Sequence, residues 1–187
     1  MEKRVLKSEV KKGLSLQDLL LTAVLLAAGA VLKFFAGTFI NFFGMKPNFN
    51  MAMYCIAIFL IRPKIYYSII IGLLAGAICQ FFPGTPYLNF GSEIAGALCM
   101  GLLIAVPAKS KTLEIVIAAA STFISTVVSG GLYVVLLFVF IKSDPSAMIA
   151  YVPIVLGTAT LNCIIVSLLY VPLMKVLKKP FIFEKSK

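Results

Sequence analysis

Six apolar runs follow one another along the chain, and short segments rich in Pro, Gly, Asn or Lys separate them. A helix needs roughly 20 apolar residues to cross a bilayer, and most of these runs approach or exceed that length. They do not alternate between apolar and polar positions, as half-buried strands do. We therefore expect six transmembrane helices at residues 16–36, 49–61, 65–82, 89–106, 113–141 and 147–173.

These helices predict an all-α fold, a polytopic membrane protein built as a six-transmembrane-helix bundle. The second run is short for a full crossing, so it either borrows loop residues or is sheltered by neighbouring helices. The expected organisation is a basic segment at 1–15, a six-helix transmembrane domain at 16–175 and a basic tail at 176–187.

The basic residues, which give the chain a net charge of +10, set the expected orientation. They gather in the N-terminal segment, at 62–64, at 109–111 and in the C-terminal segment, with two apolar runs between successive clusters. Basic loops stay on the cytoplasmic side, so we expect both termini in the cytoplasm. The clusters lack the interleaved aromatic and polar residues of a nucleic-acid-binding face, so no nucleic-acid partner is expected.

Composition narrows the class of function. Hydrophobic residues make up 61% of the chain, charged residues 13%, and there is no His. The four cysteines lie singly in apolar runs, without metal-ligand spacing, and are expected to be small buried hydrophobes. The acid and base pairs of an enzyme are missing, as are Walker motifs. We expect a binding protein that is not an enzyme, has no cofactor or metal, and has no ATPase of its own.

Polar side chains inside apolar runs are costly, which makes each of them a functional candidate. Glu93 follows the segment 83–86 and either caps the first turn of its helix or binds a cation or amine. Asn162 lies in the middle of the last run and should bond to another helix or to a ligand. Lys33 is expected to snorkel towards the interface.

The loop at 39–50 is aromatic and apolar, yet it contains Lys46. An apolar loop of this kind predicts a lid over a pocket or a re-entrant segment packed on the bundle. Phe42 lies in this loop, and Asn89 and Tyr133 are expected near the same side of the membrane. The candidate polar groups therefore gather on the outer side.

Ala23 and Ala27 form a small-xxx-small pair in the first run, which allows close approach by another helix, either within the bundle or from a separate subunit. With six helices, basic ends, a lid loop and this pair, the chain resembles the substrate-binding S component of energy-coupling-factor (ECF) transporters. The resemblance implies that Ala23 and Ala27 contact the scaffold subunit of a module that also contains two ATPases.

A shorter motif, Gly44-Met45-Lys46-Pro47-Asn48, resembles the tryptophan transport protein branch of this family, in which Asp is expected at the last position. The resemblance implies a bacterial plasma-membrane protein that binds tryptophan or a related aromatic. A water-soluble vitamin remains open as the ligand, as does, less favourably, a stand-alone secondary transporter. The substrate-binding residues that follow are Phe42, Lys46, Asn48, Asn89, Glu93, Tyr133 and Asn162.

We predict that Lys46→Ala weakens binding of a carboxylate ligand, because a charge-assisted hydrogen bond contributes roughly 1.5–3 kcal/mol. Titration of the purified variant measures the change. Unchanged affinity would leave Lys46 as a residue of the membrane interface.

Overall fold

The computed structural model describes residues 13–39, 48–82, 85, 87–141, 148–179 and 181. This part of the chain forms six helices and no strand. The helices are α1 (Leu16–Phe39), α2 (Asn50–Ile61), α3 (Ile65–Cys79), α4 (Leu88–Leu103), α5 (Lys111–Ile141) and α6 (Met148–Val176).

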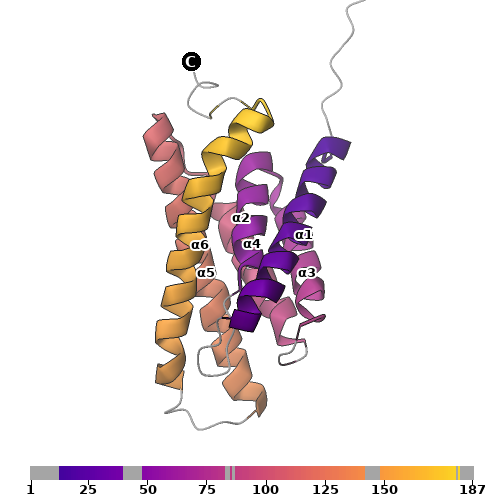
Figure 1. Ribbon diagram of the computed structural model, residues 1–187, viewed down its shortest axis with the longest axis vertical. Coiled ribbons are helices and arrows are strands. Elements are labelled where there is room, and N and C mark those ends of the chain that lie inside the picture. Colours follow the sequence, from indigo (N-terminus) through magenta and orange to yellow (C-terminus); the bar gives the residue numbers. More distant parts are fainter. Residues whose placement is uncertain are drawn as a thin grey trace, which may run out of the picture.

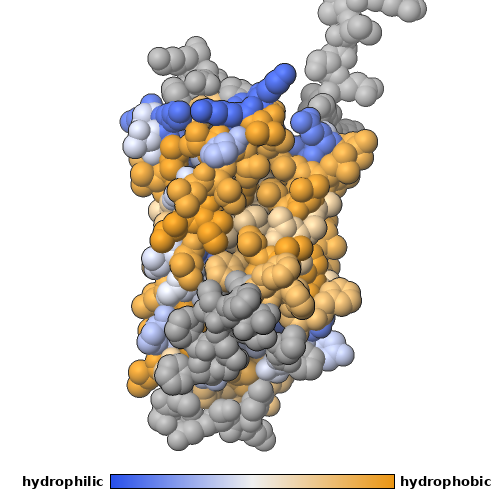
Figure 2. Space-filling view, viewed as in Figure 1, coloured by the Kyte–Doolittle hydropathy of each residue, from blue (hydrophilic) through white to orange (hydrophobic). Residues whose placement is uncertain are grey.

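The helices run alternately up and down one bundle, so α1 begins and α6 ends at the same end (Figure 1). We call this the basic end, because Arg62, Lys64, Lys109, Lys111 and Lys175 lie there. The opposite end, where α1, α3 and α5 finish, is the loop end. On the face seen in Figure 2, hydrophilic residues lie at the basic end and a broad apolar band crosses the middle.

The all-α prediction is confirmed, with helix boundaries that differ from the expected ones by a few residues. Three helices, α1, α5 and α6, are long and apolar enough to cross a membrane, whereas α2, α3 and α4 are shorter apolar helices. The third helix ends at Cys79 instead of Phe82, and the fourth ends at Leu103, four residues before Pro107. Proline disfavours a helical conformation in the residue before it, which agrees with the early end of α4.

Helix α2 is the centre of the bundle. Every residue from Asn50 to Leu60 is buried, and α2 packs against all five other helices. Its 12 residues span about 18 Å at about 1.5 Å per residue, less than the hydrocarbon thickness. Of the two expectations for this short run, shelter by neighbouring helices is therefore confirmed.

Glycines bring α3 and α4 close together. A Cβ atom placed on Gly72 would lie 2.8 Å from the carbonyl oxygen of Glu93 and 2.9 Å from the Cα atom of Ile94. A Cβ on Gly76 would lie 2.9 Å from the Cα atom of Phe90. Small residues permit this approach between helices, and here they bring the start of α4 against α3.

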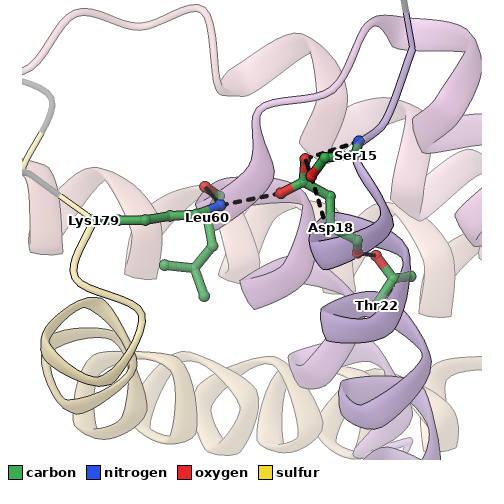
Figure 3. Close-up of polar contacts among 5 residues, drawn as sticks. All are labelled: Ser15, Asp18, Thr22, Leu60 and Lys179. Atoms are coloured by element: carbon green, nitrogen blue, oxygen red, sulfur yellow. Dashed lines mark hydrogen bonds and ion pairs between the residues drawn. The ribbon is translucent and has the colours of Figure 1, made fainter.

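At the basic end, α1 is joined to α2 and to the chain after α6 (Figure 3). Ser15 and Asp18 form a capping box: the Asp18 amide donates to Ser15 Oγ at 3.2 Å, and the Ser15 amide donates to Asp18 Oδ2 at 3.3 Å. Lys179 Nζ lies 3.3 Å from Asp18 Oδ1 and donates to the Leu60 carbonyl at 3.2 Å. These contacts tie both ends of the helical domain to the end of α2.

A second buried contact joins α5 to α6 near the same end. The Tyr170 hydroxyl donates to Glu114 Oε1 at 2.5 Å, and both side chains are almost completely buried. The Tyr170 ring also packs edge-on against Phe59 of α2. Glu114 is thus an acid with a structural partner inside the bundle.

We predict that Gly72→Ala destabilises the protein by about 1–3 kcal/mol, the usual range for overpacking, because backbone atoms of α4 block the new methyl group. The matched control is Gly131→Ala in α5, where a Cβ atom would meet nothing within 4 Å. Thermal unfolding of the purified proteins compares them. An equal midpoint for both variants would contradict the close packing of α3 on α4.

Candidate polar binding site

Glu93 is a fully buried acid on α4, near the loop end of the bundle. It lies in the second turn of α4, so the interpretation of Glu93 as a cap of the first turn is wrong. Its Oε1 atom accepts a hydrogen bond from Asn48 Nδ2 and a longer one, 3.5 Å, from the Cys79 thiol. Its Oε2 atom has no hydrogen-bond partner among the described residues.

Asn162 connects α6 to this acid through Asn48. Its Nδ2 atom lies 3.3 Å from the Asn48 carbonyl oxygen and 3.4 Å from Thr126 Oγ1 on α5. The expectation that Asn162 bonds to another helix is therefore confirmed. Since Asn48 lies two residues before the buried helix α2, these contacts gather α2, α4, α5 and α6 around one point.

Two further polar side chains of α2, Asn50 and Tyr54, are fully buried nearby. Asn50 Nδ2 donates to the Ala75 carbonyl of α3 at 3.4 Å. A Cβ atom on Gly29 of α1 would lie 2.5 Å from Asn50 Oδ1, and one on Gly96 of α4 would lie 2.6 Å from the Tyr54 hydroxyl oxygen. The two glycines thus leave the space that these polar groups occupy.

We call these side chains the polar cluster: Asn48, Asn50, Tyr54, Cys79, Glu93, Thr126 and Asn162. Five of its atoms are buried without a hydrogen-bond partner among the described residues. They are Asn48 Oδ1, Asn50 Oδ1, the Tyr54 hydroxyl, Glu93 Oε2 and Asn162 Oδ1. Buried polar atoms are satisfied in the great majority of cases, so a concentration of unpaired oxygens needs an explanation. Four of the five atoms accept hydrogen bonds only, which suits a ligand that donates them, such as an ammonium group.

The cluster contains no arrangement for metal binding in the described part of the chain, where no group of three or more His, Cys, Asp and Glu side chains is placed to hold an ion.

The structure brings together three of the residues that the sequence singled out: Asn48, Glu93 and Asn162. Asn89 lies one turn before Glu93, where its carbonyl accepts a hydrogen bond from Ser92 Oγ at 3.3 Å. Tyr133 is half-buried on the face of α5 that carries Thr126, two turns nearer the loop end. Neither makes a side-chain hydrogen bond to the described members of the cluster. Lys46 and Phe42 lie outside the described residues.

The sequence interpretation missed Asn50, Tyr54, Cys79 and Thr126 as members of this cluster. These residues could have been identified by the criterion that selected Asn162, namely a polar side chain in an apolar run. Asn50 and Tyr54 are also four residues apart, which places them on one face of a helix. The thiol of Cys79, expected to be only a small hydrophobe, turns out to make polar contacts on both sides.

Lys33 extends from α1 into this region. Its Nζ atom donates to the Cys79 sulfur at 2.9 Å and lies 5.4 Å from the centre of the Phe82 ring. The side chain is half-buried, so it does not snorkel freely into the interface as expected.

Long apolar helices around an enclosed polar cluster indicate a membrane protein. The tryptophan transporter TrpP family matches residues 15–178. The chain belongs to this family and is a transport protein. A probable tryptophan transport protein of Clostridium acetobutylicum is 26% identical over 171 residues, which cover 90% of this chain and 98% of the relative. No solved structure matches the chain. The resemblance drawn from the Gly-Met-Lys-Pro-Asn motif is confirmed.

Proposed function

We propose that this chain is the substrate-binding S component of an ECF-type importer and that it captures tryptophan from outside the cell. The observation that carries the proposal is the enclosed acid Glu93, whose free Oε2 atom lies in a cluster of unpaired acceptor oxygens. The family supports tryptophan as the ligand. An amino acid brings an ammonium group, which is the donor that such a cluster requires.

In this proposal, the ligand's ammonium group binds Glu93 together with the amide oxygens of Asn48 and Asn162. Lys46 binds its carboxylate, and Phe42 and Tyr133 line the space for the indole ring, with Asn89 near the entrance. Asn48 supplies an amide at the motif position where Asp is expected, so most of the negative charge for the ammonium group comes from Glu93.

The proposed topology has six spans, with the basic end and both termini in the cytoplasm of a bacterium. The basic residues at one end support this orientation, because positively charged loops remain cytoplasmic. The polar cluster is then on the outer side of the plasma membrane. Helices α2, α3 and α4 are short for a full crossing, and the burial of α2 by its neighbours supports its place inside the bundle.

The proposed partners are a transmembrane scaffold subunit and two ATPases, because the sequence has no Walker motif to drive uptake. Helix α1 is the least buried of the three long helices, and Ala23 and Ala27 lie on its exposed face. The small residue that packs inside the bundle is Gly29. This arrangement supports docking of the Ala23 and Ala27 face onto another subunit.

We predict that the purified protein binds tryptophan and that Glu93→Gln raises the dissociation constant roughly 10- to 100-fold, as expected for loss of a charge-assisted bond. The chain has no Trp, so fluorescence excited beyond the absorption of tyrosine comes from the ligand alone. The matched control is Glu114→Gln, which changes the buried acid near the other end of the bundle.

Equal losses of affinity in the Glu93 and Glu114 variants would point to a general loss of folding and would contradict a binding role for Glu93. If tryptophan does not bind and a riboflavin-, thiamine- or pyrimidine-like vitamin does, the alternative ligand class replaces tryptophan.

We predict that the double substitution Ala23→Leu and Ala27→Leu leaves tryptophan affinity unchanged but abolishes co-purification with the scaffold subunit and stops uptake in cells. Bulky side chains prevent close approach between helices. Ala120→Leu, at an exposed position of α5, is the control and should retain both properties. Normal uptake by the double variant would remove this face from the interface.

The alternative function, a stand-alone secondary transporter, would need neither a scaffold subunit nor ATPases. Uptake of tryptophan into liposomes that contain only this chain, without ATP, would favour it.

A further inference from the structure

The buried acid Glu93 has no direct ion pair among the described residues, although it lies deep in an apolar bundle. A buried carboxylate without compensation is strongly unfavourable, so a positive charge is expected close to it. Cys79 supplies the connection. The Lys33 ammonium group donates to the Cys79 sulfur at 2.9 Å, and the thiol donates to Glu93 Oε1 at 3.5 Å.

This relay of Lys33, Cys79 and Glu93 crosses three helices, α1, α3 and α4. Both hydrogen bonds point the same way, from the ammonium group to the thiol and from the thiol to the carboxylate. The positive charge is thereby held one side chain away from the negative charge, without direct contact. Lys33 and Glu93 are easier to separate than the partners of an equally buried direct salt bridge. Each of the two charged groups can still form a further hydrogen bond to another partner.

That unused capacity lies where a ligand's ammonium group would need it. Glu93 Oε2 is buried without a hydrogen-bond partner in the described part of the chain, and the buried Tyr54 hydroxyl lies close to Glu93. A second cation that binds Oε2 takes over the compensation of Glu93. The positive charge of Lys33 is then no longer compensated by Glu93. Lys33 is half-buried on α1 and lies 5.4 Å from the centre of the Phe82 ring.

We propose that Lys33 is a specificity-determining residue that makes the site accept only ligands carrying both a positive and a negative charge. The proposal builds on the proposed function. In the empty site, Lys33 compensates Glu93 through Cys79. When a zwitterion enters, its ammonium group pairs with Glu93, and its carboxylate pairs with Lys33 as well as with Lys46, so each charge of the ligand meets an opposite charge.

A ligand with one charge breaks this balance. Tryptamine has the ammonium group but no carboxylate, so it leaves two cations beside one buried acid. Indole-3-propionate has the carboxylate but no ammonium group, so it draws Lys33 away from Glu93 and leaves that acid without compensation. In the low dielectric of the bundle, each mismatch is expected to lower affinity at least about tenfold.

The first test uses the wild-type full chain in lipid nanodiscs, titrated with tryptophan, tryptamine and indole-3-propionate by ligand fluorescence. We expect both single-charge ligands to bind at least about tenfold more weakly than tryptophan. If tryptophan itself does not bind, the proposed function fails. If tryptophan and tryptamine bind equally well, the proposed function stands and the role of Lys33 is overturned.

The second test removes the charge with Lys33→Met, which keeps the length of the side chain. Tryptophan affinity should fall about 10- to 100-fold, whereas tryptamine affinity should rise about tenfold, because Glu93 is then left for the ligand's ammonium group alone. A gain in affinity for one ligand cannot come from misfolding. Lys109→Met, in an exposed loop at the basic end, is the matched control and should leave both affinities unchanged. An unchanged ratio of the two affinities in Lys33→Met contradicts the proposal.

Cys79 is a positioning residue in the same relay. Cys79→Ser keeps a group that both accepts and donates a hydrogen bond, whereas Cys79→Ala removes it. We expect Cys79→Ala to reduce the preference for tryptophan over tryptamine and Cys79→Ser to retain it. Equal preference in the two variants would mean that the thiol only fills space.

Discussion

The structure depends most on one constraint, that a carboxylate enclosed among apolar helices must find its compensation inside the bundle. Glu93 is this carboxylate: its side chain is fully buried, so hydrogen-bond donors of the protein must replace water around it. The groups that meet it come from several helices: an amide from Asn48 and a thiol from Cys79, which in turn receives Lys33. Glu93 therefore orders α1, α3, α4 and the start of α2 with respect to one another. Only one of its two oxygens is satisfied, so the residue that organises the loop end also keeps an unpaired acceptor, on which the proposed ligand binding depends.

Helix α2 makes this arrangement geometrically possible. A 12-residue helix that is buried on all sides can contact every other helix at once. Its first residues place Asn50 and Tyr54 in the interior, where a longer helix crossing the whole bilayer would have placed them nearer an interface. Glycines on the facing helices, Gly29 and Gly96, leave room for these two side chains. The short run is therefore not a weak transmembrane helix but the axis around which the polar site is assembled.

The fold was largely predictable from the sequence, because apolar runs and their interruptions are local signals. The six helical segments and the shelter of the second run are examples. The site was predictable only in part. Glu93 and Asn162 stand out as polar groups in apolar runs, whereas the role of Cys79 depends on contacts with α1 and α4 that no spacing along the chain reveals. The turn in which Glu93 lies depends on where α4 begins, and α4 begins at Leu88, one residue before the expected start.

Two buried carboxylic acids, Glu93 and Glu114, lie near opposite ends of this bundle, and their surroundings differ. Near the basic end, Glu114 receives the Tyr170 hydroxyl at 2.5 Å, and that ring packs on Phe59 of the central helix. Near the loop end, Glu93 is held by an amide and a distant thiol and keeps Oε2 unpaired. An unsatisfied buried oxygen is a penalty in the empty protein, and a ligand that donates to it removes that penalty as it binds. In the proposed function, part of the affinity for an ammonium group therefore comes from the unpaired Oε2 atom of Glu93. Stability is supplied by contacts such as Glu114 with Tyr170, which the ligand does not touch.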